Sequence, residues 1–124
     1  MLLPQTPNPA LDRSLVAIDL IGELDGRLGE ILDEALADVA ARGDFHVVVN
    51  FDFVSAVHAD GIRAAGKAIV AAKVRGENVS ASVSPRNRRM RSVLKDARVT
   101  VFEPGATKSP TGARRIMIAR SVPR

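Results

Sequence analysis

Phe53-Val-Ser-Ala-Val-His-Ala-Asp-Gly61 joins the end of an apolar strand to the start of an alanine-rich helix. Asp60 stands where this helix is expected to begin, and the first backbone N–H groups of a helix have no partner within it. The helix dipole also places partial positive charge at that end. A carboxylate, or a phosphate added to a hydroxyl, is therefore favoured at this position.

Apolar strands and amphipathic helices alternate on both sides of this stretch. A largely buried strand at 15–21 should end at Gly22, and the others are expected at 45–51, 79–83 and 99–102. Helices are predicted from Leu28 to a stop at Gly43, from Asp60 to a stop at Gly76, and from Ser84-Pro85 to Ala97. This order predicts an α/β fold with a four- to five-stranded, mostly parallel sheet and three crossover helices.

The composition fits one domain with an aliphatic core. The chain has 124 residues, 46% of them hydrophobic, with four Phe and no Trp or Tyr. The absence of cysteine excludes thiol chemistry and disulfides. No signal peptide is recognisable, and no apolar run approaches the roughly 20 residues that a transmembrane helix needs. We therefore expect a cytoplasmic protein without a transmembrane segment.

Proline and charge divide the chain into three parts. Residues 1–13 hold three prolines, which suit a central strand poorly. Residues 14–103 form the predicted domain. Residues 104–124 form a basic tail, because five Lys or Arg residues and no acid follow Glu103. Within this tail, Ile116-Met-Ile118 is compatible with either an edge strand or a short helix.

Three motifs, in order, resemble those of the STAS domain family, the fold of bacterial anti-sigma factor antagonists. Gly22-Glu-Leu-Asp25 is similar to the turn that follows an apolar strand in that family. Val54-Ser-Ala-Val-His-Ala-Asp-Gly61 is similar to its (apolar)-x-x-(apolar)-Asp-Ser-Ser/Thr-Gly helix start, and Ser84-Pro85 to the start of a later helix. The resemblance covers roughly residues 14–103. Its implication is a single STAS-like domain.

The resemblance also implies a regulated surface at 58–60. In the family, the second hydroxyl of the Asp-Ser-Ser-Gly loop is phosphorylated by a partner kinase, which releases the bound anti-sigma factor. Here the three positions are His58, Ala59 and Asp60. A Ser/Thr kinase cannot esterify an aspartate, so the resemblance implies that this switch is lost. Asp60 supplies one fixed negative charge, compared with about −1.5 to −2 for a phosphate.

The resemblance implies a non-catalytic protein that needs no cofactor and binds an anti-sigma factor with a kinase-like domain, or a related regulator. A homodimer is possible within the same family. An alternative is a cytoplasmic accessory subunit of a membrane transporter of the lipid ABC type. Asp60 has a second interpretation as a helix N-cap only, worth about 0.5–2 kcal/mol over Ala. The expected contact surface comprises Ser55, His58, Ala59, Asp60, Gly61, Ile62 and Arg63.

Other sequence features favour structural roles. His58 and His46 do not match a recognised metal-ligand spacing, so we expect His58 to be an ordinary loop residue and no metal to be bound. Gly22–Gly29 lacks the Gly-x-Gly-x-x-Gly spacing of a nucleotide loop. Arg86, Arg88, Arg89 and Arg91 crowd a helix start where the dipole does not favour them. Without Trp or Tyr as stacking platforms, we do not expect nucleic-acid binding.

Overall fold

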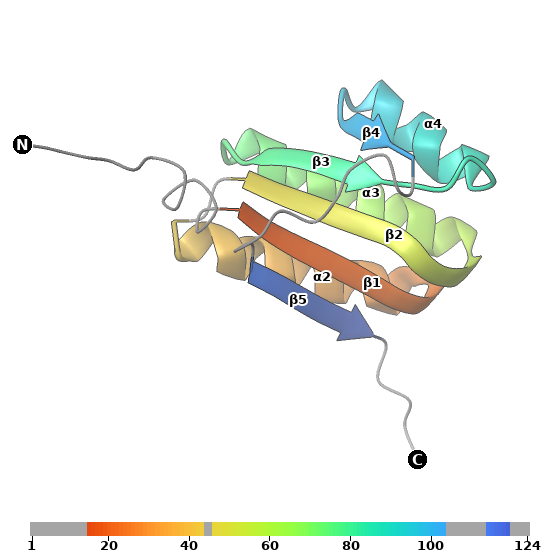
Figure 1. Cartoon of the computed structure of the whole chain (residues 1–124), viewed down its shortest axis with the longest axis horizontal. Helices are drawn as coiled ribbons and strands as arrows, with labels where there is room; N and C mark the ends of the chain where they lie inside the picture. The colour runs from red at the N-terminus through yellow and green to blue at the C-terminus, as the bar shows by residue number, and fades with distance from the viewer. Residues whose placement is uncertain (1–14, 44–45, 104–113, 120–124) are drawn as a thin grey trace, which may run out of the picture.

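The computed structural model describes residues 15–43, 46–103 and 114–119. The described strands lie side by side in one sheet, with the helices packed behind it (Figure 1). The strands are β1 (Leu15–Leu24), β2 (His46–Val57), β3 (Asn78–Ser82), β4 (Thr100–Phe102) and β5 (Arg114–Ala119). The helices are α2 (Gly26–Ala41), α3 (Ala59–Val74) and α4 (Arg88–Asp96).

The sheet is parallel throughout, in the order β4-β3-β2-β1-β5. Each of the described helices, α2, α3 and α4, links two neighbouring parallel strands and crosses the same face of the sheet (Figure 1). The predicted α/β architecture, with a mostly parallel sheet and three crossover helices, is therefore confirmed. No described helix is long and apolar enough to cross a bilayer.

The core lies between this sheet and the helices, and it is aliphatic as predicted. Alternate side chains of β1 point to it, because successive residues of a strand face opposite sides of a sheet. On α2 the core residues recur at three- and four-residue steps. The residues of these two elements that belong to the core are Val16, Ile18, Leu20, Leu24, Leu28, Leu32, Leu36 and Val39.

Two strands extend further than the sequence predicts. Gly22 does not end β1, which continues to Leu24, and β2 continues past Phe51 to Val57. The pairing of β1 with β2 persists through two register shifts, and Gly22 accommodates the irregularity with φ +95°. The predicted loop before α3 is therefore mostly strand, and it is rigidly paired with β1.

The start of α4 also differs from the prediction. Ser84-Pro85 forms a turn instead, in which the Ser84 Oγ accepts from the Arg86 N–H at 3.2 Å. The helix begins at Arg88, where the Asn87 side chain accepts from the Met90 N–H at 3.4 Å. Asn is a preferred N-cap, so it fixes the helix start three residues after the proline.

Part of the basic tail completes the sheet. Residues 114–119 form β5, which pairs in parallel with β1 and thereby decides between the strand and helix alternatives for Ile116–Ile118. The edge of β1 that an N-terminal strand could have occupied is thus taken by β5, while residues 1–13 lie outside the described residues. The division of the chain into three parts remains a prediction.

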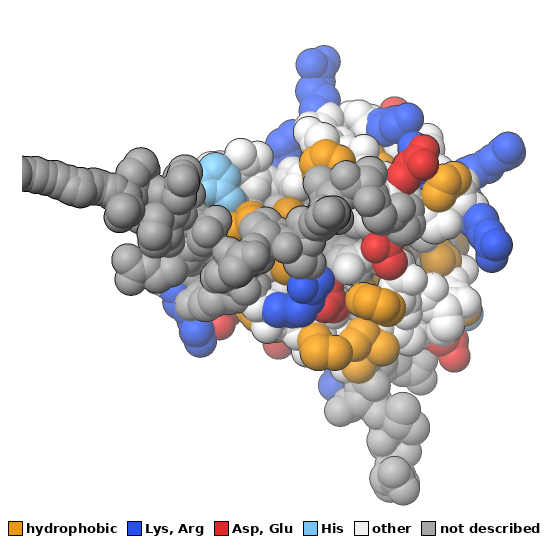
Figure 2. Space-filling model, in the orientation of Figure 1, with side chains coloured by type: hydrophobic (Ala, Val, Ile, Leu, Met, Phe, Trp, Pro, Cys, Tyr) orange, Lys and Arg blue, Asp and Glu red, His pale blue; other side chains and the backbone are white. Residues whose placement is uncertain are grey.

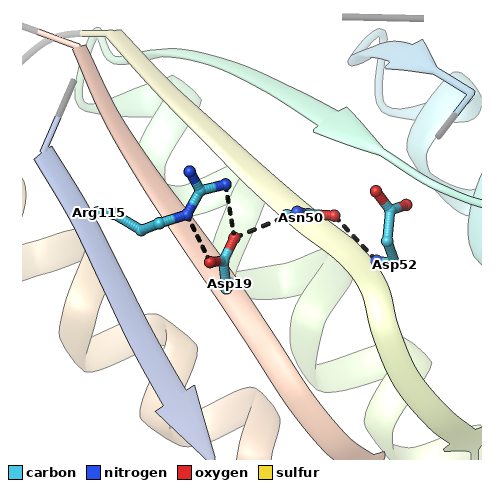
Figure 3. Close-up of polar contacts among 4 residues, drawn as sticks. All are labelled: Asp19, Asn50, Asp52 and Arg115. Carbon is cyan, nitrogen blue, oxygen red and sulfur yellow. Dashed lines mark hydrogen bonds and ion pairs between the residues drawn. The ribbon is translucent and has the colours of Figure 1, made fainter. Parts of the chain in front are cut away.

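A chain of polar contacts crosses the sheet on the face away from the helices (Figure 3). Asp19 of β1 is only 2% exposed. It accepts from the Arg115 Nε of β5 at 2.7 Å and from the Asn50 Nδ2 of β2 at 3.2 Å. The Asn50 Oδ1 accepts from the Asp52 N–H at 2.9 Å, and the Ser82 Oγ donates to Asp52 at 3.0 Å. Four neighbouring strands are therefore linked at one level of the sheet.

The same face also carries apolar side chains. Figure 2 shows a hydrophobic group over the end of β5 and the adjacent part of β1. The register places Ile21 beside both Phe53 and Ala119. Phe53 is 56% exposed and Met117 is 66% exposed. This face therefore combines a polar belt with a small apolar area.

Candidate functional site

The end of β2 leads directly into α3, and this junction positions the predicted site residues. His58 is the N-cap of α3, with extended backbone and no side-chain capping hydrogen bond. Asp60 is the second residue of the helix and the acidic residue of its first turn. The alternative interpretation of Asp60 as the N-cap of this helix is therefore wrong. Its carboxylate still lies at the positive end of the helix, where a negative charge contributes about 0.3–1 kcal/mol.

The backbone of this junction is held tightly against β1. The His58 N–H donates to the Leu24 carbonyl at 2.9 Å. A Cβ built on Gly61 would lie 2.1 Å from the same oxygen and 2.4 Å from the carbonyl carbon. Only glycine fits at 61, because any side chain there would collide with backbone. The first turn of α3 is consequently fixed relative to the end of β1.

The first turns of α2 and α3 lie beside each other. The Asp25 side chain caps α2 by accepting from the Leu28 N–H at 3.0 Å. A Cβ on the neighbouring Gly26 would be 3.1 Å from the Asp60 Oδ2. The Asp60 carboxylate therefore lies near the positive ends of two helices. Among the described residues, none forms a hydrogen bond or an ion pair with it.

The two histidines occupy opposite ends of β2. His58 Nε2 lies 2.9 Å from the Glu23 Oε1, and both side chains are about half exposed. His46 Nδ1 lies 3.3 Å from the Asn78 Nδ2 at the other end of the strand. His58 follows the last residue of β2, so twelve residue steps separate the two histidines, or roughly 40 Å at a rise of about 3.3 Å per residue. The two histidines therefore cannot share a ligand. His58, which we expected to be an ordinary loop residue, contacts Glu23.

The predicted contact surface is only partly accessible. Gly61 and Ile62 are buried beneath the first turn of α3, with Ile62 only 6% exposed. The remaining residues form an exposed strip from the last part of β2 along the first turn of α3. They are Ser55, His58, Ala59, Asp60 and Arg63.

Sequence reasoning missed two further features of the structure. Asp19 stands in the middle of an apolar run, and an acid at such a position is a signal for a buried polar partner. The partner could not be found from spacing, because Arg115 comes from the far end of the chain. The second feature is a groove between α3 and α4 that begins at Ala59. It depends on how two helices pack, which local sequence does not specify.

Comparison with known proteins supports the assignment of the fold. No family model matches the chain, and no curated protein matches it in sequence. A solved structure described as the anti-sigma factor antagonist SpoIIAA in its unphosphorylated form is similar to it, with a TM-score of 0.55 and 22% sequence identity. The similarity covers 77% of this chain and 83% of that chain. The chain therefore has the fold of a STAS-like domain.

Proposed function

We propose that this chain is a non-catalytic regulatory protein that binds a partner protein in the manner of an anti-sigma factor antagonist. The observation that carries the proposal is the exposed Asp60 carboxylate in the first turn of α3, on a STAS-like fold. The solved structure with the similar fold is an anti-sigma factor antagonist in its unphosphorylated form. We infer that the partner here is an anti-sigma factor with a kinase-like domain, or a related cytoplasmic regulator.

The interface of this proposal is the strip that contains Ser55, His58, Asp60 and Arg63. The backbone of this strip runs from the part of β2 that pairs with β1 into the first turn of α3, where the His58 N–H donates to Leu24, so little backbone conformational entropy is lost on binding. The carboxylate of Asp60 has no partner among the described residues and is free to meet a donor from another protein. A preorganised, partly charged strip of this kind suits protein recognition.

The charge at Asp60 is permanent under this proposal. A carboxylate carries one negative charge and cannot be removed by a phosphatase, whereas a phosphoserine carries about −1.5 to −2 and can. We propose that partner binding is therefore set by expression or by competing partners, and not by phosphorylation at this position. His58 contacts Glu23 and not a hydroxyl, so its geometry gives no activated nucleophile.

The experiment is capture of the tagged chain's partner from its own cells, followed by hydrogen exchange on the purified complex. The proposal predicts that amides of residues 55–63 become protected and that Asp60→Arg abolishes capture. Asp33→Arg is the matched control, because Asp33 is an exposed acid on α2, away from the strip. Capture that is insensitive to Asp60→Arg, or protection confined to other elements, would contradict the proposal. Recovery of a permease complex through the strip would favour the transporter-accessory role.

A further inference from the structure

A groove runs between α3 and α4. It starts at Ala59, within the exposed strip described above, which is called the Asp60 strip below. Its volume is about 720 Å³. Along α3, its lining residues recur at three- and four-residue steps from Ala59 to Ala71. Those twelve steps correspond to a groove length of about 18 Å at 1.5 Å per residue. The groove therefore has the length of a helix of about three turns.

The floor of the groove is apolar, and its depth depends on a glycine. Ile62 and Val70 of α3 face Val93 of α4 across it. A Cβ on Gly66 would lie 2.9 Å from a methyl group of Val93, so the glycine allows the two helices to approach closely. Val70 is 42% exposed, so it adds accessible apolar surface to the floor of the groove. An apolar partner surface would cover it.

The rim of the groove is basic. Arg63, Lys67 and Arg89 line it and are exposed, whereas Asp96 is the acid among its described lining residues. Arg63 and Lys67 are four residues apart on α3, so both lie on the α3 side of the groove. Arg89 faces them from α4. A ligand in the groove is therefore met by positive charge from both sides.

The charges on the helices are segregated by element, and this segregation adds to the positive charge around the groove. The exposed face of α2 is mainly acidic, with Glu30, Asp33, Glu34 and Asp38 against one exposed cation within the helix, Arg27. Lys and Arg side chains gather around α4, at the upper right of Figure 2. The first turn of α4 contains Arg88 and Arg89, where the helix dipole does not favour a cation, so helix stability does not explain them. The resulting field directs an anionic partner towards the α3–α4 groove and away from α2.

We infer that the α3–α4 groove docks an acidic amphipathic helix of the partner protein, with its apolar side chains on the Ile62–Val70–Val93 floor and its carboxylates beside Lys67 and Arg89. This deepens the proposed function, on which it rests, by giving the chemistry of the partner segment that continues from the Asp60 strip. Helix-in-groove recognition combines apolar anchors with a charged rim, and the groove offers both.

The test uses a fluorescent, helix-constrained peptide of about 14 residues, with Leu at positions i, i+3, i+4 and i+7 and Glu at the exposed positions. A second peptide carries Lys in place of Glu. Fluorescence anisotropy with the full chain should show binding of the acidic peptide only. Lys67→Glu/Arg89→Glu should weaken it by at least about ten-fold and favour the lysine peptide. Arg27→Glu, an exposed charge reversal on α2, should change neither affinity.

Three outcomes would overturn the inference. They are no binding of the acidic peptide, equal binding of both peptides, and acidic-peptide binding that survives the double charge reversal. A fourth outcome concerns dimerisation, measured by sedimentation of the wild-type chain and of Val70→Glu. A wild-type dimer that is lost in Val70→Glu would assign the groove to a second copy of the chain. Because the peptide assay needs no cellular partner, its failure is distinguishable from failure of Asp60-dependent capture.

Discussion

Arg115 Nε lies 2.7 Å from Asp19 Oδ2, although the two residues are 96 positions apart in the sequence. Asp19 is almost fully buried, whereas the Arg115 side chain is 40% exposed. The side-chain hydrogen bond to Asp19 raises the pKa of Arg115 above its ordinary value. The contact ties β5 to the sheet by joining its side chain to the adjacent strand β1.

Replacing Arg115 should therefore destabilise the fold through Asp19. Arg115→Met leaves a buried carboxylate with Asn50 as a remaining donor, and an undersatisfied buried charged group costs about 1–3 kcal/mol. Urea denaturation of the purified protein measures this loss. Arg27→Met, on the exposed face of α2, should stay within about 0.5 kcal/mol of wild type. Equal stability of the two variants would mean that the ion pair does not hold β5.

Two glycines at the helix starts provide a matched pair. Gly61→Ala should cost about 3 kcal/mol or more, because its Cβ would lie 2.1 Å from the carbonyl oxygen of Leu24 and the backbone would have to move. Gly26→Ala should instead stabilise by about 0.4–1 kcal/mol, since its Cβ meets only the flexible end of Asp60 at 3.1 Å.

Thermal unfolding of both glycine variants checks the packing of the two helix starts. The described geometry requires a large fall in the midpoint for Gly61→Ala and none for Gly26→Ala. If the two midpoints shift alike, the close approach between α3 and β1 is not present in solution.

Substitutions of the N-cap residues of α2 and α3 should change the stability of the fold in different directions. Asp25→Ala removes the acceptor for the Leu28 N–H and should cost about 0.5–2 kcal/mol. His58→Asn places a preferred capping residue where the present side chain makes no capping bond, so it should be neutral or stabilising by up to about 1 kcal/mol. Guanidinium denaturation measures the free energy of unfolding of both variants. A substantial loss for His58→Asn would show that the half-exposed Glu23 contact stabilises the fold more than a cap does.

The periodic parts of the fold were predictable from sequence. The apolar runs predicted the strands, the amphipathic spacing predicted the helices, and the strand–helix order predicted the parallel sheet. The boundaries of the strands and helices were harder to predict. Gly22 resembles a strand end, but an irregular register lets β1 and β2 stay paired beyond it. Ser84-Pro85 resembles a helix start, but the Asn87 cap takes precedence.

The site was predictable to the extent that it is local. The placement of Asp60 at the start of α3 followed from the sequence, because one strand–helix junction contains all the necessary signals. The burial of Gly61 against Leu24 depends on contact with another strand, and the groove depends on Gly66 meeting Val93 of another helix. Such relationships arise from packing between distant segments, so spacing along the chain does not encode them in a recognisable way.

The affinity of the captured partner for Asp60→Asn tests the central claim most directly. This change removes the charge while keeping the size of the side chain. We predict that it weakens binding by at least about ten-fold, or 1.4 kcal/mol, that Asp33→Asn on α2 leaves binding unchanged, and that ATP does not alter the wild-type affinity. An unchanged dissociation constant for Asp60→Asn, together with a lower unfolding midpoint, would contradict the account and leave Asp60 with a role in helix stability alone.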